Sequence, residues 1–274
     1  MTPVGTVAAL RRYPVKSMLG EELAAVRVAA GGFDGDRALA LIDTSSGRIA
    51  TAKHPRLWRR LLQLSATRGD DGSVSITLPD GSVLDAAGSQ VGEVLSEVLG
   101  RPVRLAAERP DGASVERPAP EDVIASGVEA EVPFATVEIA LGTPGGTFVD
   151  HSPVHLITTA TVEHIGTEAL RYRPNVVIAT PPGPPFAENG WRGREVTIGE
   201  VRLRVTLPTP RCSVPTLEHG ELPRALHAVR TPLAENRIDV LGTGAMPCAG
   251  VYAEVVTGGT IHADDPVHIG PPAS

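Results

Sequence analysis

The residues of this chain that could do chemistry lie in four polar clusters, which interrupt apolar runs typical of β-strands. The clusters occupy residues 13–17, 35–37, 150–152 together with 173–175, and 208–213. They contribute cationic side chains, several hydroxyl groups and one thiol, that of Cys212. Guanidinium and ammonium groups bind phosphate, and a thiolate binds a soft transition metal. These residue types predict a site for a multivalent anion beside a metal.

Each cluster also has an ordinary structural explanation when it is taken alone. Lys16 and Ser17 follow a strand-like run, where a solvated turn is common. Arg37 ends a Gly-Asp-Arg sequence typical of a turn with an ion pair, and Arg173 precedes a proline at a predicted strand entry. A single cysteine such as Cys212 is often a small buried hydrophobic residue and not a ligand. The clusters alone therefore leave both interpretations open.

Short β-like runs alternate with turn sequences along most of the chain, which contains 29 glycines and 25 prolines. Strands are predicted at residues 4–13, 23–28, 38–43, 62–66, 74–77, 103–106, 175–179, 195–198, 201–207, 250–256 and near 267. Helices are predicted at residues 91–99, 153–165 and 222–234, and a loop or linker at 109–127. The pattern predicts a mainly β fold with a few helices. We expect a small N-terminal β-barrel-like domain (1–100), a linker region (101–130) and a larger β-barrel domain (131–270).

Composition limits the classes of function. A formal net charge of −7 argues against binding to nucleic acid or to an anionic membrane. No run approaches the roughly 20 apolar residues that span a bilayer, and the start lacks a signal-peptide pattern, so we expect a cytoplasmic protein. Cys212 and Cys248 are the only cysteines, too few for an iron–sulfur cluster, and we interpret Cys248 as a structural thiol. His151 and His155 have a zinc-like spacing but lack a third ligand.

Two groups of motifs resemble the two parts of a known family. Tyr-Pro-Val-Lys-Ser-Met-Leu-Gly-Glu (13–21) and Gly-Phe-Asp-Gly-Asp-Arg (32–37) resemble the N-terminal β-barrel domain that precedes MOSC domains. The segments from Asp150 onward resemble the MOSC domain, which is named after the C-terminal domain of molybdenum cofactor sulfurases. The matching pieces are Ser-Pro-Val-His-Leu-Ile-Thr-Thr (152–159), Arg-Pro-Asn-Val-Val-Ile (173–178), Pro-Phe-Ala-Glu-Asn-Gly-Trp (185–191), Arg-Cys (211–212) and Gly-Val-Tyr-Ala-Glu-Val (250–255). The resemblance runs in order along most of the chain.

The resemblance implies a molybdenum cofactor, molybdopterin, held between the two parts. Carried over by motif, Lys16, Ser17 and Arg37 would hold the cofactor phosphate. Cys212 would be the catalytic residue and the protein ligand to molybdenum. The residues that would line the pterin are Asp150, Ser152, Arg173, Asn175 and Arg211.

The best-known enzymes of this family resemble the mitochondrial amidoxime-reducing component, which reduces N-hydroxylated compounds. The implied function is a molybdenum-dependent oxidoreductase that removes oxygen from N-hydroxylated small molecules. Since the sequence has no motif for a flavin, a haem or an iron–sulfur cluster, electrons would come from a separate reductase or ferredoxin-like protein. Two alternatives stay open. One is a carrier that delivers the cofactor, or sulfur on Cys212, without turnover; the other is a binding protein that kept the fold and lost the cofactor.

Overall fold

The computed structural model of the chain describes residues 1–240, 242 and 244–271. Seven strands in this part form a closed β-barrel: β1 (Thr2–Arg12), β12 (Val154–Thr158), β13 (Val176–Ala179), β14 (Glu195–Ile198), β15 (Val201–Pro210), β17 (Met246–Thr257) and β19 (Pro266–Ile269). Their order around the barrel is β12-β13-β1-β19-β14-β15-β17, and pairing of β12 with β17 closes it. Neighbouring strands are antiparallel except β12 and β13, which are parallel.

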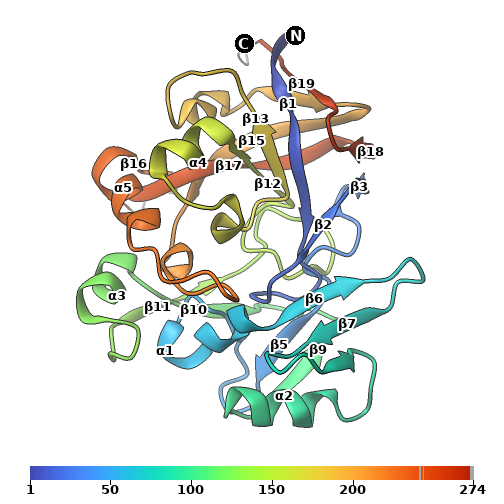
Figure 1. Cartoon of the computed structure of the whole chain (residues 1–274), viewed down its shortest axis with the longest axis vertical. Helices are drawn as coiled ribbons and strands as arrows, with labels where there is room; N and C mark the ends of the chain where they lie inside the picture. Colours follow the sequence, from blue (N-terminus) through green and yellow to red (C-terminus); the bar gives the residue numbers. More distant parts are fainter. Residues whose placement is uncertain (241, 243, 272–274) are drawn as a thin grey trace.

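The barrel forms because its strands alternate apolar and polar side chains, so that one face of each strand points inward. In β15, Val201, Leu203 and Val205 are buried, whereas Arg202 and Arg204 between them are exposed. Buried side chains from all seven strands meet in one apolar core. Figure 1 shows the barrel in the upper half of the molecule, with both chain ends at the same side of it. The predicted mainly β fold is confirmed.

A second group of elements lies below the barrel in Figure 1 and has its own apolar core. It contains the pair β5 (Ala40–Asp43) and β9 (Val103–Ala106), and the sheet β6 (Ser65–Arg68), β7 (Val74–Thr77) and β8 (Val83–Asp85). Helix α2 (Val91–Leu99) buries Leu95 and Leu99 in this core. It ends at Gly100, whose φ of 68° is the left-handed conformation that favours glycine. The short helix α1 (Pro55–Trp58) and a 3₁₀ turn, Arg59–Gln63, lie between β5 and β6 in the chain.

Strand β1 joins the two groups of elements, because the first strand of the chain is part of the barrel. It pairs with β13 on one side and β19 on the other, and its end also pairs with β2 (Glu21–Leu23). A small sheet makes a second connection, since β3 (Ala25–Ala29) pairs with β4 (Gly32–Phe33) and with β18 (Gly259–His262). Residues 13–17 therefore follow a barrel strand directly. The domain limits 1–100 and 131–270 stay a prediction.

The prediction that residues 109–127 form a loop or linker is wrong. Strand β10 (Ser114–Pro118) pairs along its whole length with β11 (Phe134–Glu138), and α3 (Pro120–Ser126) follows it. Pro120 stands at the first turn of α3, where its missing N–H costs nothing. The partner strand lies beyond the predicted loop, so the local pattern could not reveal this ladder.

The prediction of one helix at residues 153–165 is wrong in its first half. Strand β12 is buried along its whole length and pairs on both sides, so its apolar run is that of a central strand. Helix α4 (Thr159–Ile165) begins only after Thr158, whose Oγ1 accepts a hydrogen bond from the backbone N of Thr161 at 3.3 Å. His151 and His155 therefore do not share a helix face, and the zinc-like spacing loses its basis.

Smaller differences concern element boundaries. The helix predicted at 222–234 is α5 (His227–Glu235), and the strand predicted at 62–66 starts only with β6, because a 3₁₀ turn occupies residues 59–63. The remaining elements are 3₁₀ turns at Ala169–Tyr172, Ala187–Trp191 and Val214–Thr216, and the short strand β16 (Arg237–Ile238). Among the described residues, no helix is long and apolar enough to cross a bilayer.

Candidate functional site

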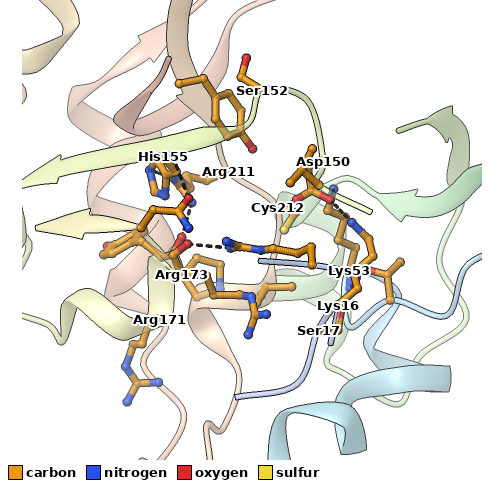
Figure 2. A pocket seen from close by; sticks show the side chains of 18 residues that line it. Lys16, Ser17, Lys53, Asp150, Ser152, His155, Arg171, Arg173, Arg211 and Cys212 are labelled. Carbon is orange, nitrogen blue, oxygen red and sulfur yellow. Dashed lines mark hydrogen bonds and ion pairs between the residues drawn. The ribbon is translucent and has the colours of Figure 1, made fainter. Parts of the chain in front are cut away.

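One cleft brings together all nine residues that the sequence identifies as candidates. It contains about 690 Å³ of empty space, including open solvent at its mouth, and lies where segments following β1 and β15 meet segments preceding α1, β12 and β13. Figure 2 shows the side chains that line it. The nine candidates in its wall are Lys16, Ser17, Arg37, Asp150, Ser152, Arg173, Asn175, Arg211 and Cys212. The wall also contains residues that the sequence did not identify as candidates for this cofactor site: Thr51, Lys53, Val149, His155, Arg171, Tyr172, Val214, Pro215 and Tyr252.

The wall of the cleft is strongly cationic. Among the described lining residues, six carry a lysine or arginine side chain and one, Asp150, carries a carboxylate; two of the six cations also pair with carboxylates outside the lining, Arg37 with Asp36 and Arg171 with Glu168. This is the reverse of the chain as a whole, whose formal net charge is −7. A cleft of this charge concentrates anions, and guanidinium groups add hydrogen bonds to the attraction.

At one end of the cleft, the Asp150 carboxylate accepts hydrogen bonds from the ammonium groups of Lys16 and Lys53. We call these three residues the lysine end. Asp150 Oδ1 lies 2.6 Å from Lys16 Nζ and 2.8 Å from Lys53 Nζ (Figure 2). Lys16 Nζ also donates to the carbonyl oxygen of Phe148 at 2.7 Å. Burial lowers the pKa of Lys16 to about 8, although Asp150 opposes the shift. Burial alone would raise the pKa of Asp150, but Lys16 and Lys53 outweigh it and hold that pKa well below its ordinary value.

Ser17 lies beside the lysine end in an uncommon backbone conformation, with φ of 65°. Its Oγ donates to Thr51 Oγ1 at 3.2 Å and accepts from the backbone N of Ala52 at 3.2 Å. These bonds fasten the segment after β1 to the segment before α1, which brings Lys16 and Lys53 to the same carboxylate.

At the arginine end, which we define as Tyr13, Arg37 and Arg173, two guanidinium groups lie over one aromatic ring. The Cζ atoms of Arg37 and Arg173 are 4.4 and 4.3 Å from the centre of the Tyr13 ring. Arg37 Nη1 donates to Asp36 Oδ2 at 2.5 Å, and Arg37 Nη2 donates to the carbonyl oxygen of Arg173 at 2.9 Å. Burial lowers the pKa of Arg37, but Asp36, together with Tyr13 and Asp150, outweighs burial, and the net shift of the pKa is upward.

Arg173 is compensated far less than Arg37. Its Nη1 donates to the carbonyl oxygen of Met18 at 2.7 Å, whereas its buried Nη2 has no hydrogen-bond partner among the described residues. Burial, together with the charge of Arg37, lowers the pKa of Arg173 to about 10. A buried donor without a partner is costly, so a ligand atom that accepts from it would be favoured.

Arg211 and Asn175 use their polar atoms mainly to hold the mouth of the barrel. Arg211 donates to the carbonyl oxygens of Ala249 and Tyr172, and its Nη2 lies 2.6 Å from His155 Nε2. Burial, with the nearby Arg211, lowers the pKa of His155 well below its ordinary value, which makes Nε2 an acceptor. Asn175 Oδ1 accepts from the backbone N of His155 at 3.1 Å. Both side chains shape the wall of the cleft more than they offer free donors.

The two cysteines lie in different surroundings. Cys212 comes two residues after β15, is half-buried and lines the cleft beside the Ala52, Val214 and Leu217 cluster. Cys248 is fully buried in β17, in a small apolar cluster that includes Leu207. Burial raises the pKa of the Cys248 thiol to about 11. A ligand in the cleft therefore has access to Cys212, and the interpretation of Cys248 as a structural thiol agrees with its burial.

Two family profiles match the chain over most of its length. The profile described as "MOSC domain" matches residues 145–268, and the one described as "MOSC N-terminal beta barrel domain" matches residues 4–107. The chain is a MOSC-domain protein. The resemblance seen in the sequence motifs is confirmed.

This MOSC protein is distantly similar to a mouse protein and to two bacterial proteins of known structure. The mitochondrial amidoxime-reducing component 1 of Mus musculus is 24% identical over 295 residues, which cover 97% of this chain and 82% of the mouse protein. Among solved structures, the YuaD protein from Bacillus subtilis has a TM-score of 0.44 and 9% identity, over 97% of this chain and 95% of that one. YiiM from Geobacillus stearothermophilus has a TM-score of 0.32 and 16% identity, over 58% and 72% of the two chains.

The cleft of this MOSC protein fits an anionic cofactor that carries a soft metal. The excess of cations and the buried Arg173 Nη2, which has no partner in the described part of the chain, suit a phosphate. The thiol of Cys212 suits molybdenum better than a hard cation. Within the described residues, no group of three or more His, Cys, Asp or Glu side chains could hold a metal by itself. A metal here would therefore need ligands from a cofactor besides Cys212.

Lys53 and Tyr13 are the notable residues that sequence reasoning missed as parts of the site. Lys53 stands in a Thr-Ala-Lys-His-Pro segment, which resembles an ordinary solvated turn. Tyr13 only begins a sequence motif, and as a buried ring it resembles any core aromatic residue. Nothing near either residue in the sequence indicates its partners, which come from distant segments.

Proposed function

We propose that this MOSC protein binds the molybdopterin form of the molybdenum cofactor in the cleft and reduces N-hydroxylated small molecules. One observation carries the proposal: the accessible thiol of Cys212 shares a cleft with an excess of cationic side chains. A soft metal and a phosphate would each find the ligand type they prefer there. The name of the mouse relative, an amidoxime-reducing component, supports the choice of substrate class.

In this proposal the nine candidates keep the roles that the motifs imply. Cys212 is the protein ligand to molybdenum and the catalytic residue, and Lys16, Ser17 and Arg37 hold the phosphate. Ser152 contributes mainly to the shape of the pterin site, because its Oγ already contacts His151 Nδ1 at 2.9 Å and Thr206 Oγ1 at 3.2 Å. The other residues that line the pterin are Asp150, Arg173, Asn175 and Arg211.

The net reaction balances with two electrons and two protons. An N–OH compound takes them up, the N–O bond breaks, and the products are the N–H compound and water. When bound, the cofactor would supply the two-electron chemistry of this step. The residues of the chain orient the cofactor and hold protons at defined atoms. Lys16 Nζ, with a pKa of about 8, is such an atom beside Asp150.

The electrons would come from a separate protein of the reductase or ferredoxin type. The chain contains two cysteines, fewer than an iron–sulfur cluster requires, and no flavin or haem motif is evident in its sequence. A bound cofactor in the cleft would thus depend on a partner for each turnover. Cytoplasmic location stays a prediction.

A matched pair of cysteine variants tests the proposal. Cys212→Ala should lower the molybdenum content of the purified protein by roughly tenfold or more, because replacing even a residue that only supports a metal ligand lowers metal affinity by about that factor. Cys248→Ala removes a thiol of the same type outside the cleft and should keep the molybdenum content of the wild type. The measurements are metal analysis, molybdopterin fluorescence after oxidation, and reduction of benzamidoxime by dithionite-reduced protein.

The outcomes separate the alternatives. Molybdenum and benzamidoxime reduction that disappear together in Cys212→Ala support the oxidoreductase. Bound cofactor without turnover from any electron donor would favour the carrier. A wild-type protein that binds no molybdopterin when expressed in cells that make it would leave only a binding protein that has lost the cofactor.

A further inference from the structure

We propose that Tyr13 is a positioning residue, whose ring holds Arg37 and Arg173 together as a seat for a phosphate group. The seat exists in the chain whatever fills it. That its ligand is the cofactor's phosphate rests on the proposed function, to whose phosphate-holding residues the seat adds Arg173. Tyr13 itself does not line the cleft, so it acts through the two arginines and does not touch the ligand.

The first support is the geometry of the three side chains. Both guanidinium groups lie within the distance at which a cation is attracted by a ring, at 4.4 Å for Arg37 and 4.3 Å for Arg173. Two like charges that share one ring repel each other, and the negative face of the ring offsets part of that repulsion. Besides the ring, the carboxylates of Asp36 and Asp150 are the negative groups that act on both guanidinium charges, and only Asp36 forms an ion pair with either of them, Arg37.

The second support is how strongly the chain fixes this arrangement. Arg37 and Arg173 both have positive φ, 46° and 56°, a conformation that is uncommon outside glycine. The backbone N of Arg37 donates to the carbonyl oxygen of Tyr13 at 2.8 Å, and the backbone N of Tyr13 donates to Asp36 Oδ1 at 2.8 Å. Strained backbone that several hydrogen bonds hold in place is typical of functional sites.

The third support is the charge that stays uncompensated. Arg37 has Asp36, but Arg173 has no carboxylate partner in the described part of the chain. Its Nη2 is also buried and lacks a hydrogen-bond partner within residues 1–240, 242 and 244–271. Since Arg173 lines the cleft (Figure 2), an anion that enters can supply both the missing charge and the missing acceptor. Phosphate offers several acceptor oxygens and matches the fork of a guanidinium group.

Two substitutions at position 13 separate the ring from its hydroxyl group. The hydroxyl is buried and has no hydrogen-bond partner among the described residues, so Tyr13→Phe removes a group that the seat does not use. Tyr13→Leu removes the ring. Phe186→Leu is the matched control, since it removes an aromatic ring that packs near His164, away from the cleft.

The probe is inorganic phosphate, titrated into cofactor-free protein and followed by calorimetry. Tyr13→Leu should weaken phosphate binding by about tenfold, the size expected for the loss of two cation–π contacts. Tyr13→Phe should restore binding to within roughly twofold of the wild type, and Phe186→Leu should bind as the wild type does. A folded Tyr13→Leu variant with unchanged phosphate affinity would overturn the proposal.

A second measurement needs no variant, in case Tyr13→Leu does not fold. In the wild type, the ring should shift the Nε–H nuclear magnetic resonance signals of Arg37 and Arg173 upfield, and phosphate should move both signals. Phosphate that moves neither signal also overturns the proposal. Failure of this proposal and failure of the proposed function can be told apart. A protein that binds phosphate at these arginines but never binds molybdenum would contradict the proposed function and still support the seat.

Discussion

At the lysine end of the cleft, two ammonium groups share the Asp150 carboxylate, whereas at the arginine end one of two guanidinium groups has no carboxylate partner in the described residues. The lysine end also has a backbone acceptor, the carbonyl oxygen of Phe148. The arginine end relies on the Tyr13 ring and on Asp36. The same cleft therefore holds positive charge in two different ways.

The difference shows which charges are stable without a ligand. Buried cations need partners, and the lysine end has most of its own, so it can persist as a preformed wall. The arginine end leaves a buried donor, Arg173 Nη2, for a ligand to satisfy. Affinity for an anion should thus depend more on the arginine end, and stability of the empty fold more on the lysine end.

The largest expected effect is that of Arg173→Gly on anion affinity. Glycine accepts the φ of 56° at this position without strain, so the substitution removes the guanidinium group with little backbone cost. Phosphate affinity should fall roughly ten- to hundredfold, because hydrogen bonds to charged groups contribute about 1.5–3 kcal/mol. Calorimetric titration of the cofactor-free protein measures it.

A distant cation is the control for that variant. Arg202 lies on the exposed face of β15, pairs with Glu195 at 2.6 Å and does not line the cleft. Arg202→Ala should keep the wild-type phosphate affinity. Equal losses in both variants would mean that the probe senses only the net charge of the protein, and the distinction between the two ends would fail.

A smaller and opposite effect is expected at the lysine end. Asp150→Asn removes the carboxylate that Lys16 and Lys53 share, and it also lowers the pKa of Lys16 further. At a pH low enough to keep Lys16 protonated, phosphate should therefore bind several times more tightly. The free energy of unfolding should fall by about 1–2 kcal/mol, less than for a fully buried pair because water screens the partly exposed Asp150. Chemical denaturation and calorimetry measure the two quantities. A variant that is both more stable and weaker in binding would contradict the contrast between the ends.

The candidate site was predictable from the sequence to the extent that its residues stand in polar clusters at strand ends. All nine candidates line the cleft because such ends meet at one side of a barrel, and the family resemblance indicated which clusters belong together. The alternation along β15 and the periodicity of α2 also predicted those elements correctly, since both are local patterns.

The missed features depend on contacts between distant segments. The ladder of β10 with β11 and the strand β12 both owe their form to partners far along the chain. Lys53 belongs to the site because the Asp150 carboxylate lies between Lys53 and Lys16. Tyr13 belongs to it because the guanidinium group of Arg173 lies over the Tyr13 ring. A single sequence contains no pattern that records such pairings.

The smallest expected effect is a pH dependence that belongs to the lysine end alone. Burial lowers the pKa of Lys16 to about 8, so this ammonium group loses its proton as the pH rises through that value. The pKa of Arg173, lowered to about 10 by burial and by Arg37, leaves the arginine end charged up to that pH. Sulfate, whose own charge is constant, should therefore bind severalfold more weakly at pH 9 than at pH 7.

The variant Lys16→Gln tests whether Lys16 is the group whose titration causes this change in sulfate affinity. It removes the titrating group, so its sulfate affinity should be lower than that of the wild type at pH 7 and nearly constant between pH 7 and 9. A step of the same size in Lys16→Gln would place the titrating group elsewhere. A flat profile in the wild type would mean that Asp150 and the carbonyl oxygen of Phe148 keep Lys16 charged, and the lysine end would then resemble the arginine end in its response to pH.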